Sequence, residues 1–309
     1  MSGSRRKPWL AGLVSLLVPG LGHLYAGRPR EAAVAFLVSE LAITTVLVPV
    51  FLLVPPLNVL IAILGLLVLV IGIPLHAARA ASASPSYQLR WYNRWYVYLG
   101  LWVVSAVLLQ WRYDYTKAHL VEAFRVPSGS MEPTVRAGDY LYVGKWEATR
   151  RDLRHGRVVV FESVEEPGLK VIKRVIGLPG DTLRMAGGTL YRNRKPLTEP
   201  YTIRLDPGRS EDPVQRAKMR YWQVDHLAGQ ASATYQPDLE EWGPLVVAAD
   251  SLFVLGDNRD ASYDSRYWGF LPRGNVVGQP RVVYFSYDPK GSAPFLRRVR
   301  WGRIGQALQ

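Results

Sequence analysis

The sequence predicts N-terminal transmembrane helices followed by a mostly-β domain, and two observations support this division. Long apolar stretches are confined to residues 1–112, whereas residues 113–309 hold short runs rich in Val, Ile, Tyr and Phe between Gly-Asp and Pro-Gly turns. The first 112 residues carry nine Lys/Arg and two acids, which is +7 of the total formal charge of +13. The basic excess is therefore denser beside the apolar stretches, as expected for a membrane protein.

Four stretches of the N-terminal part are nearly free of charge, at 10–26, 32–54, 57–75 and 95–111. A membrane-spanning helix needs roughly 20 apolar residues, so the second and third stretches suffice and the other two are borderline. The first contains "PGLGHLYAG" (19–27), whose glycines and proline loosen a helix. We therefore expect 10–26 to be re-entrant or interfacial and the other three stretches to be spans.

Basic residues between these stretches predict the orientation. The clusters are Arg5, Arg6 and Lys7, then Arg28 and Arg30, then Arg79, Arg90 and Arg94. The positive-inside rule assigns all three clusters to the cytoplasm and the uncharged turn at Pro55-Pro56 to the outside. With three spans, residues 113–309 lie outside the membrane on the extracytoplasmic side. Four spans would instead leave them in the cytoplasm.

Glu40 and His23 are ionisable residues within the apolar stretches. Such a group at membrane depth raises a functional hypothesis. Snorkelling or helix packing explains it equally well, so neither residue is assigned a catalytic role.

The composition excludes some classes of function. The chain has no cysteine, which rules out zinc fingers and disulfides. No basic stripe is interleaved with aromatic residues on one helix, which argues against nucleic acid as a partner.

Several segments after residue 113 predict β-strands, namely "YLYVGKW", "RVVVFES", "KVIKRVIG", "LFVLGD" and "RVVYFSY". Residues 200–242 are more polar and irregular. We expect them to form an excursion from the sheet, with no role that the sequence discloses.

The turn "FRVPSGSMEPTVR" (124–136) carries two serines between prolines, and a serine nucleophile requires a base. His119, His155 and His226 are the histidines of this part, but none lies in a motif-like context, which makes a Ser-His-Asp triad unattractive without excluding it. Lys173 is the other candidate. In "LKVIKRVIG" strand alternation puts it on an otherwise apolar face, where burial would lower its pKa toward that of a general base. A lysine that snorkels to water from a strand end remains the alternative.

A third stretch, "GDNRDASYDSRYWG" (256–269), predicts a turn-rich loop. Ser262, Asp264 and Arg266 alternate within it, so an extended segment would point them the same way. Asp264 and Arg266 would form a charge-assisted pair, and Ser262 could orient a lysine amine. A purely structural or calcium-like acidic loop is the alternative, although the arginines and the missing EF-hand spacing count against calcium.

Together, "PSGSMEPT", "VIKRVIGLPGD" and "GDNRDASYDSR", in this order after a membrane anchor, resemble bacterial signal peptidase I, a membrane-bound serine peptidase with a Ser-Lys dyad. The resemblance covers about 124–278 and implies a catalytic domain of the signal-peptidase type. It implies that Ser130 is the nucleophile and Lys173 its general base. The oxyanion hole would consist of the Ser128 hydroxyl and the Ser130 backbone N–H. The residues that support the site would be Ser262, Asp264 and Arg266. It also implies that Val126, Pro127, Met131, Val171 and Ile172 lie near shallow pockets for small substrate side chains.

This sequence departs from the family pattern at three points. Ala261 stands where Asn is common, Arg157 stands where an Asp after the glycine is usual, and the family usually has one or two anchoring spans. Both single positions look structural, so the resemblance still implies activity.

The resemblance implies an endopeptidase of the bacterial inner membrane, multi-pass, that removes signal peptides on the periplasmic side. Its partners would be preprotein signal peptides and membrane lipid, and it would need no metal or cofactor. One alternative is a Ser-Lys peptidase of the self-cleaving repressor kind, against which the membrane stretches argue. The other is a catalytically silent membrane scaffold or chaperone that binds exported segments through the same groove.

Overall fold

The computed structural model describes residues 6–47, 63–83, 89–147, 151–204, 212–229, 232, 234–292 and 294–308. The chain divides into two compact units, Met1–Lys117 and Ala118–Gln309.

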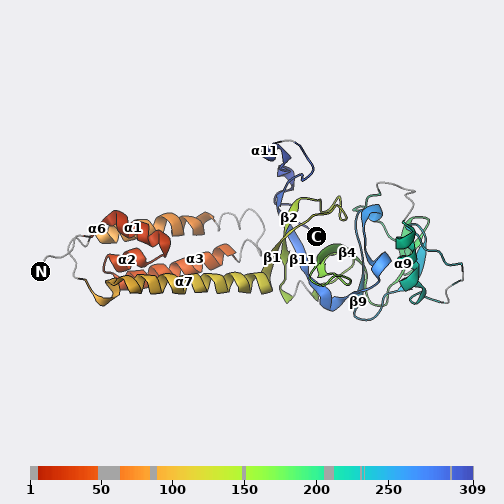
Figure 1. The fold of residues 1–309 in the computed structure, drawn as a ribbon, viewed down its shortest axis with the longest axis horizontal. Helices are drawn as coiled ribbons and strands as arrows, with labels where there is room; N and C mark the ends of the chain where they lie inside the picture. Colours follow the sequence, from red (N-terminus) through yellow and green to blue (C-terminus); the bar gives the residue numbers. More distant parts are fainter. Residues whose placement is uncertain are drawn as a thin grey trace. The chain divides into compact units, whose positions relative to one another are not determined.

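The described residues of the first unit are helical (Figure 1). Its elements are α1 (Pro8–Leu17), α2 (Leu21–Tyr25), α3 (Pro29–Leu47), the π-helical η1 (Val68–Gly72), α6 (Ile73–Ser82), the short η2 (Trp91–Asn93) and α7 (Trp95–Tyr115), and η3 (Thr116–Leu120) follows. Small residues allow the close approach of α1, α2 and α6, since their buried core consists largely of alanines. At Gly22 a Cβ would lie 2.0 Å from the carbonyl oxygen of Ala11, so only glycine fits there.

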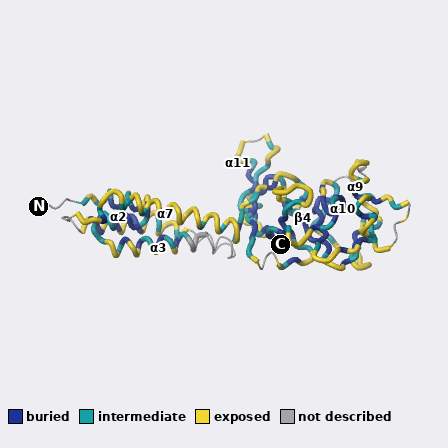
Figure 2. The backbone as a smooth tube through the Cα atoms, turned by 60° about the horizontal axis from the view of Figure 1, so that its bottom comes forward, coloured by how far each residue is buried: buried dark blue, intermediate teal, exposed yellow. Residues whose placement is uncertain are grey.

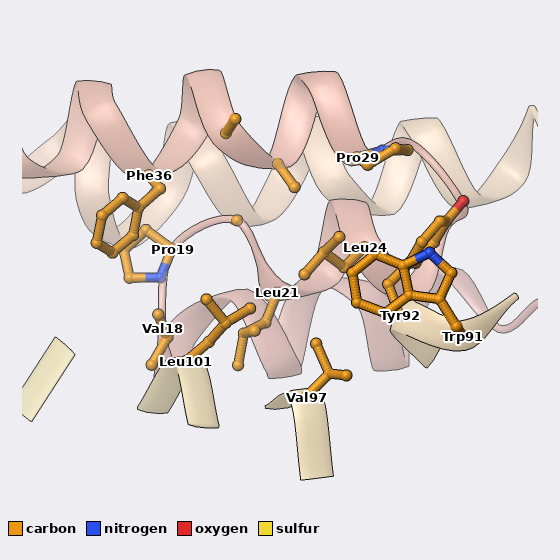
Figure 3. A pocket seen from close by; sticks show the side chains of 13 residues that line it. Val18, Pro19, Leu21, Leu24, Pro29, Phe36, Trp91, Tyr92, Val97 and Leu101 are labelled. Atoms are coloured by element: carbon orange, nitrogen blue, oxygen red, sulfur yellow. The ribbon is translucent and has the colours of Figure 1, made fainter. Parts of the chain in front are cut away.

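The "PGLGHLYAG" segment (19–27) begins in the break after α1, which ends at Leu17, and contains the whole of α2. Figure 3 shows the apolar pocket beside this break, which Pro19, Leu21 and Leu24 line together with Phe36 of α3 and Trp91 of η2. Its volume is about 380 Å³. The loosened segment thus forms part of the interior of this unit. Whether 10–26 is re-entrant stays a prediction.

Among the described residues, one helix, Ile63–Ser82, is long and apolar enough to cross a membrane. The prediction of several spans is therefore not supported. α3 contains Glu31 and Glu40, and α7 ends with Arg112 and Asp114, so both helices are more polar than Ile63–Ser82. Residues 48–54 and 57–62 of the expected spans, and the turn at Pro55-Pro56, lie outside the described residues.

Exposed residues are frequent in this unit (Figure 2), and many of them are large and apolar. α7 has no buried residue, and its exposed set includes Trp95, Trp102, Val107 and Trp111. Glu40, the ionisable residue within α3, forms an ion pair with Arg112 of α7.

The second unit is mostly β, as predicted from its sequence, and its described strands form two antiparallel sheets. The first has seven strands in the order β1 (Val121–Arg125), β2 (Asp139–Gly144), β11 (Val276–Ser286), β3 (Val158–Glu162), β4 (Lys170–Gly177), β9 (Ser251–Leu255) and β10 (Leu271–Pro272). The second has four in the order β7 (Lys195–Pro196), β6 (Thr189–Arg192), β5 (Thr182–Ala186) and β8 (Trp242–Val246). Three clusters of buried Val, Leu, Ile, Met and aromatic side chains form the core of this unit.

Residues 200–242, expected to be irregular, contain the helix α9 (Pro213–Val224). Asp212 caps its N-terminus by accepting a hydrogen bond from the Val214 N–H, and Pro213 suits the first helical position. Residues 205–211 lie outside the described part.

Candidate active site

Ser130 and Lys173 meet in the second unit although 43 positions separate them. Ser130 lies in the turn-rich segment between β1 and β2, and Lys173 lies on β4. The Lys173 Nζ is 2.8 Å from the Ser130 Oγ. A hydroxyl and an amine thus lie within hydrogen-bond distance, which is the separation that a nucleophile and its base require.

Lys173 is buried, with 3% of its surface exposed. The pKa of its ammonium is lowered from 10.5 to about 8, chiefly by burial; the charge of Arg266 contributes to this shift, while Asp264 and Asp257 oppose it. A substantial fraction of the amine is therefore neutral near pH 7 to 8 and able to accept a proton.

Ser128 lies beside Ser130, with the two hydroxyl oxygens 3.4 Å apart. The Ser128 Oγ and the Ser130 backbone N–H belong to the same turn. A hydroxyl and a backbone N–H are the kinds of hydrogen-bond donor that form an oxyanion hole.

The loop after β9 places Ser262, Asp264 and Arg266 together, all of them buried. The Ser262 hydroxyl donates to Asp264 Oδ2 at 2.7 Å, and Arg266 forms a two-point ion pair with the same carboxylate at 2.8 and 3.0 Å. The Gly256 N–H also donates to Asp264 Oδ2, at 3.0 Å. Charge-assisted hydrogen bonds outweigh the effect of burial, so the Asp264 pKa is lowered and the carboxylate stays ionised. The hydroxyl of Ser262 is thus directed to Asp264, while the predicted orientation of the Lys173 amine by Ser262 stays a prediction.

This loop also fixes the position of the backbone at Gly129 and Ser130. The Asn258 N–H donates to the Ser130 carbonyl at 3.2 Å, and the Asn258 amide donates to the Gly129 carbonyl at 3.3 Å. A Cβ at position 256 would lie 2.5 Å from the Ser130 carbonyl oxygen, so a glycine is required there. The loop and the serine turn therefore form one packed assembly.

Sequence reasoning missed the pair formed by Arg174 and Asp257, both buried next to the assembly. Arg174 donates to the two carboxylate oxygens at 2.8 and 2.6 Å, and Thr134 donates to Oδ2 at 2.6 Å. The guanidinium carbon also lies 4.0 Å from the centre of the Tyr201 ring. The sequence offered one signal for this pair. Arg174 follows Lys173 directly, and Asp257 lies within the loop 256–269, so both residues belong to motifs already singled out.

Another missed contribution comes from α9. The Trp222 Nε1 and the Gln223 amide donate to the Arg266 carbonyl at 2.7 and 3.2 Å. The excursion at 200–242 thus holds the C-terminal end of the loop that carries Asp264.

A pocket of about 250 Å³ adjoins the serines. Four of the five predicted substrate-pocket residues line it, namely Val126, Pro127, Val171 and Ile172, together with Ser128, Ser130 and Lys173. Met131 is instead fully buried in a core cluster with Val126 and Leu141. Its packing in this cluster fixes the position of the turn that carries Ser130.

The histidines take other partners. His155 Nε2 lies 2.6 Å from Asp181 Oδ2, and His226 Nδ1 lies 2.8 Å from the Trp222 carbonyl oxygen. The described side-chain partners of Ser130 are Lys173 and Ser128. The arrangement around Ser130 therefore favours lysine as the base.

At the two positions that depart from the sequence pattern, the side chains take no part in the hydrogen bonds described around Ser130. Ala261 ends the short helix η4 (Arg259–Ala261), and Arg157 lies 3.6 Å from Asp152.

Comparison with known proteins gives consistent results. Residues 94–285 match the family described as signal peptidase, peptidase S26. Signal peptidase I of Pseudomonas aeruginosa is 36% identical over 202 residues, covering 57% of this chain and 69% of the relative. A probable signal peptidase I-2 of Synechocystis sp. is 34% identical over 222 residues, covering 68% of this chain and 85% of the relative.

A crystal structure of a signal peptidase I from Enterococcus faecalis is 28% identical and covers 41% of this chain and 94% of its own, with a TM-score of 0.27. That score is too low to support a structural argument. The family match and the two sequence relatives suffice, and the chain belongs to the signal peptidase, peptidase S26, family.

Proposed function

We propose that this protein is a membrane-bound serine endopeptidase that cleaves N-terminal signal peptides from exported preproteins, with Ser130 as nucleophile and Lys173 as general base. The relatives named signal peptidase I support the substrate class. The observation that carries the mechanism is the 2.8 Å distance between the Lys173 Nζ and the Ser130 Oγ, combined with a lysine pKa of about 8.

In acylation, the neutral Lys173 amine takes the Ser130 hydroxyl proton as the oxygen attacks the scissile carbonyl carbon. The tetrahedral intermediate collapses, the C–N bond breaks, and the ammonium returns its proton to the departing amine. In deacylation the amine takes a proton from water, the resulting hydroxide attacks the ester, and Ser130 recovers its proton. One base serves both steps, and the reaction needs no redox partner.

Negative charge on the carbonyl oxygen would be stabilised by the Ser130 N–H and the Ser128 hydroxyl. Such donors are worth about 10²–10³ in kcat each. Asp264 has a different role, because its carboxylate fixes Ser262 and Arg266 at 2.7 and 2.8 Å and so holds the loop against the serine turn. We assign Ser262, Asp264 and Arg266 as positioning residues.

Substrate would bind as an added strand along β4. β9 pairs with β4 from Arg174 onward, while Lys170–Lys173 pairs with β3 alone among the described strands. An unpaired strand edge offers backbone hydrogen bonds to an extended peptide. The 250 Å³ pocket beside this edge would take small side chains next to the cleaved bond.

The helix Ile63–Ser82 is the proposed anchor in the bacterial cytoplasmic membrane. The catalytic unit would then lie on the outer side, where exported preproteins emerge. Lipid would contact the exposed apolar side chains of the first unit.

The test is cleavage of a preprotein with an Ala-X-Ala site by detergent-purified full-length protein from pH 6 to 10. We expect wild type to cleave with a rate that rises to a plateau above about pH 8, and Ser130→Ala and Lys173→Ala to be inactive while folded. Ser292→Ala, an exposed serine, is the matched control. Equal cleavage by wild type and both active-site variants would refute the dyad, and no cleavage by folded wild type would favour the scaffold function.

A further inference from the structure

The helical unit contains a cluster of potential metal ligands that the proposed peptidase function leaves unused. It consists of His23 on α2, Glu31 in the first turn of α3, and His76 on α6. One ligand atom from each lies within 4.8 Å of the others. Three helices thus converge on one point with two imidazoles and a carboxylate.

His23 is the buried member of the cluster, with 1% of its surface exposed. Its Nε2 lies 2.8 Å from the His76 Nδ1, and its Nδ1 is buried without a hydrogen-bond partner. At this separation the two facing nitrogens have room for one proton between them. A cation bound to both lone pairs would replace that proton.

Glu31 is also only partly satisfied. Its Oε1 accepts from the Arg28 guanidinium at 2.8 Å, whereas its Oε2 is buried without a partner. Buried polar atoms in proteins are normally paired, so each exception calls for a missing partner. The Glu31 Oε2 belongs to a residue that can ligate metal and lies in this cluster, so a cation bound by the facing His23 Nε2 and His76 Nδ1 would supply its missing partner.

The donor set identifies the class of ion. Two histidines and a glutamate form a known three-ligand set for zinc, with a fourth position open to water. Ring nitrogens select zinc, copper or nickel over magnesium and calcium, which prefer oxygen. With Zn–N bonds of about 2.0–2.1 Å, tetrahedral ligand atoms are separated by about 3.3 Å. The 2.8 Å nitrogen separation requires an adjustment of a few tenths of an ångström.

We propose that His23, Glu31 and His76 bind one divalent transition-metal ion of the zinc class, which fastens α2 and the start of α3 to α6. This gives the "PGLGHLYAG" segment a specific task, because His23 lies within it. Arg28 competes with the ion for the Glu31 carboxylate.

The experiment uses full-length protein in detergent, purified with a tag that contains no histidine. After treatment with a chelator, Zn²⁺ is added and bound metal is measured by mass spectrometry following desalting. We expect about one zinc per chain, at least tenfold weaker binding by His76→Ala and by Glu31→Gln, and no displacement by excess Mg²⁺. Because His23 is buried, His23→Ala could unfold the unit, so the exposed His76 and the isosteric Glu31→Gln carry the test.

Two further variants sharpen the result. His226→Ala removes an exposed histidine of the other unit and should retain full zinc binding. Arg28→Gln removes the competing cation and should bind zinc more tightly than wild type. Equal zinc binding by wild type and His76→Ala, or no binding by folded wild type, would overturn the proposal, and the peptidase assay is unaffected by either outcome.

Discussion

Two neighbouring residues of β4, Lys173 and Arg174, are both buried cations with opposite uses. Their exposed surfaces are 3% and 5%. Arg174 meets the Asp257 carboxylate at two points, 2.8 and 2.6 Å. Lys173 faces the Ser130 hydroxyl, and within the described chain it has no carboxylate in ion-pair contact.

With the proposed mechanism, one strand would support both the chemistry and the structure of the site. Without a direct counter-ion, burial dominates and lowers the Lys173 pKa to about 8, which yields a proton acceptor. The two-point ion pair of Arg174 with Asp257 instead fastens β4 to the loop after β9. If this distinction is right, removing each cation should damage a different property.

The largest effect is expected from Lys173→Met on turnover. Methionine fills the same space without an amine, so the Ser130 hydroxyl loses its base and kcat should fall by about 10⁴-fold or more. The melting temperature should stay the same or rise, since a buried amine is removed. Preprotein cleavage and thermal unfolding measure the two properties. Lys195→Met, at an exposed position on β7, serves as control, and a kcat within tenfold of wild type would contradict the role of Lys173.

Arg174→Met should act mainly on stability. It leaves the Asp257 carboxylate buried and unpaired, which costs about 3–5 kcal/mol. For a unit of this size the melting temperature should drop by on the order of 10 °C. The double variant Arg174→Met/Asp257→Leu should recover much of the loss because no charge remains buried. A single variant as stable as wild type would show that the pair contributes little.

The contrast also explains what the sequence could predict. Three local motifs single out Ser130, Lys173 and the Asp264 loop, which the structure brings together, and composition predicts the mostly-β unit. They give no indication of the ion pair that Arg174 forms with Asp257. The ion pair of Arg174 depends on the register between β4 and β9, in which Arg174 is opposite Leu255. This register joins segments that are far apart in the chain, so neither segment alone predicts it.

Other differences between the sequence prediction and the structure also depend on contacts between distant residues. Met131 belongs to the serine motif, yet packing turns it into the core instead of the pocket. The hydrogen bonds from α9 to the Arg266 carbonyl join residues more than 40 positions apart. In the helical unit, apolar composition predicted three spans, whereas one helix of the described residues is long and apolar enough to cross a membrane. Polar residues lie within α3 and in the last turn of α7.

A smaller effect is expected at the second serine. Ser128→Ala removes the proposed side-chain donor to the carbonyl oxygen, so kcat should fall by about 10²–10³ with little change in KM. Ser128→Thr keeps a hydroxyl and should retain more activity. Steady-state cleavage of the same preprotein measures both variants. An unchanged kcat in Ser128→Ala would leave the backbone N–H of Ser130 as the main donor.

The smallest expected effect is the change of folding stability with pH that the titration of Lys173 causes. Its folded-state pKa of about 8 lies below its usual 10.5, so between these values the unfolded chain binds more protons than the folded one. Stability should therefore rise with pH in this window, by about 1.5 kcal/mol from pH 8 to 9.5.

The measurement is the melting temperature of wild type minus that of Lys173→Met at each pH. Titration of the other lysines and of the tyrosines is shared by the two proteins and cancels in this difference. We expect the difference to move in favour of wild type by about 3–6 °C over the window. A difference independent of pH would mean that Lys173 titrates near its usual value and remains an ammonium at neutral pH. In that case Lys173 would be a charged structural residue, and the contrast with the structural role of Arg174 would disappear.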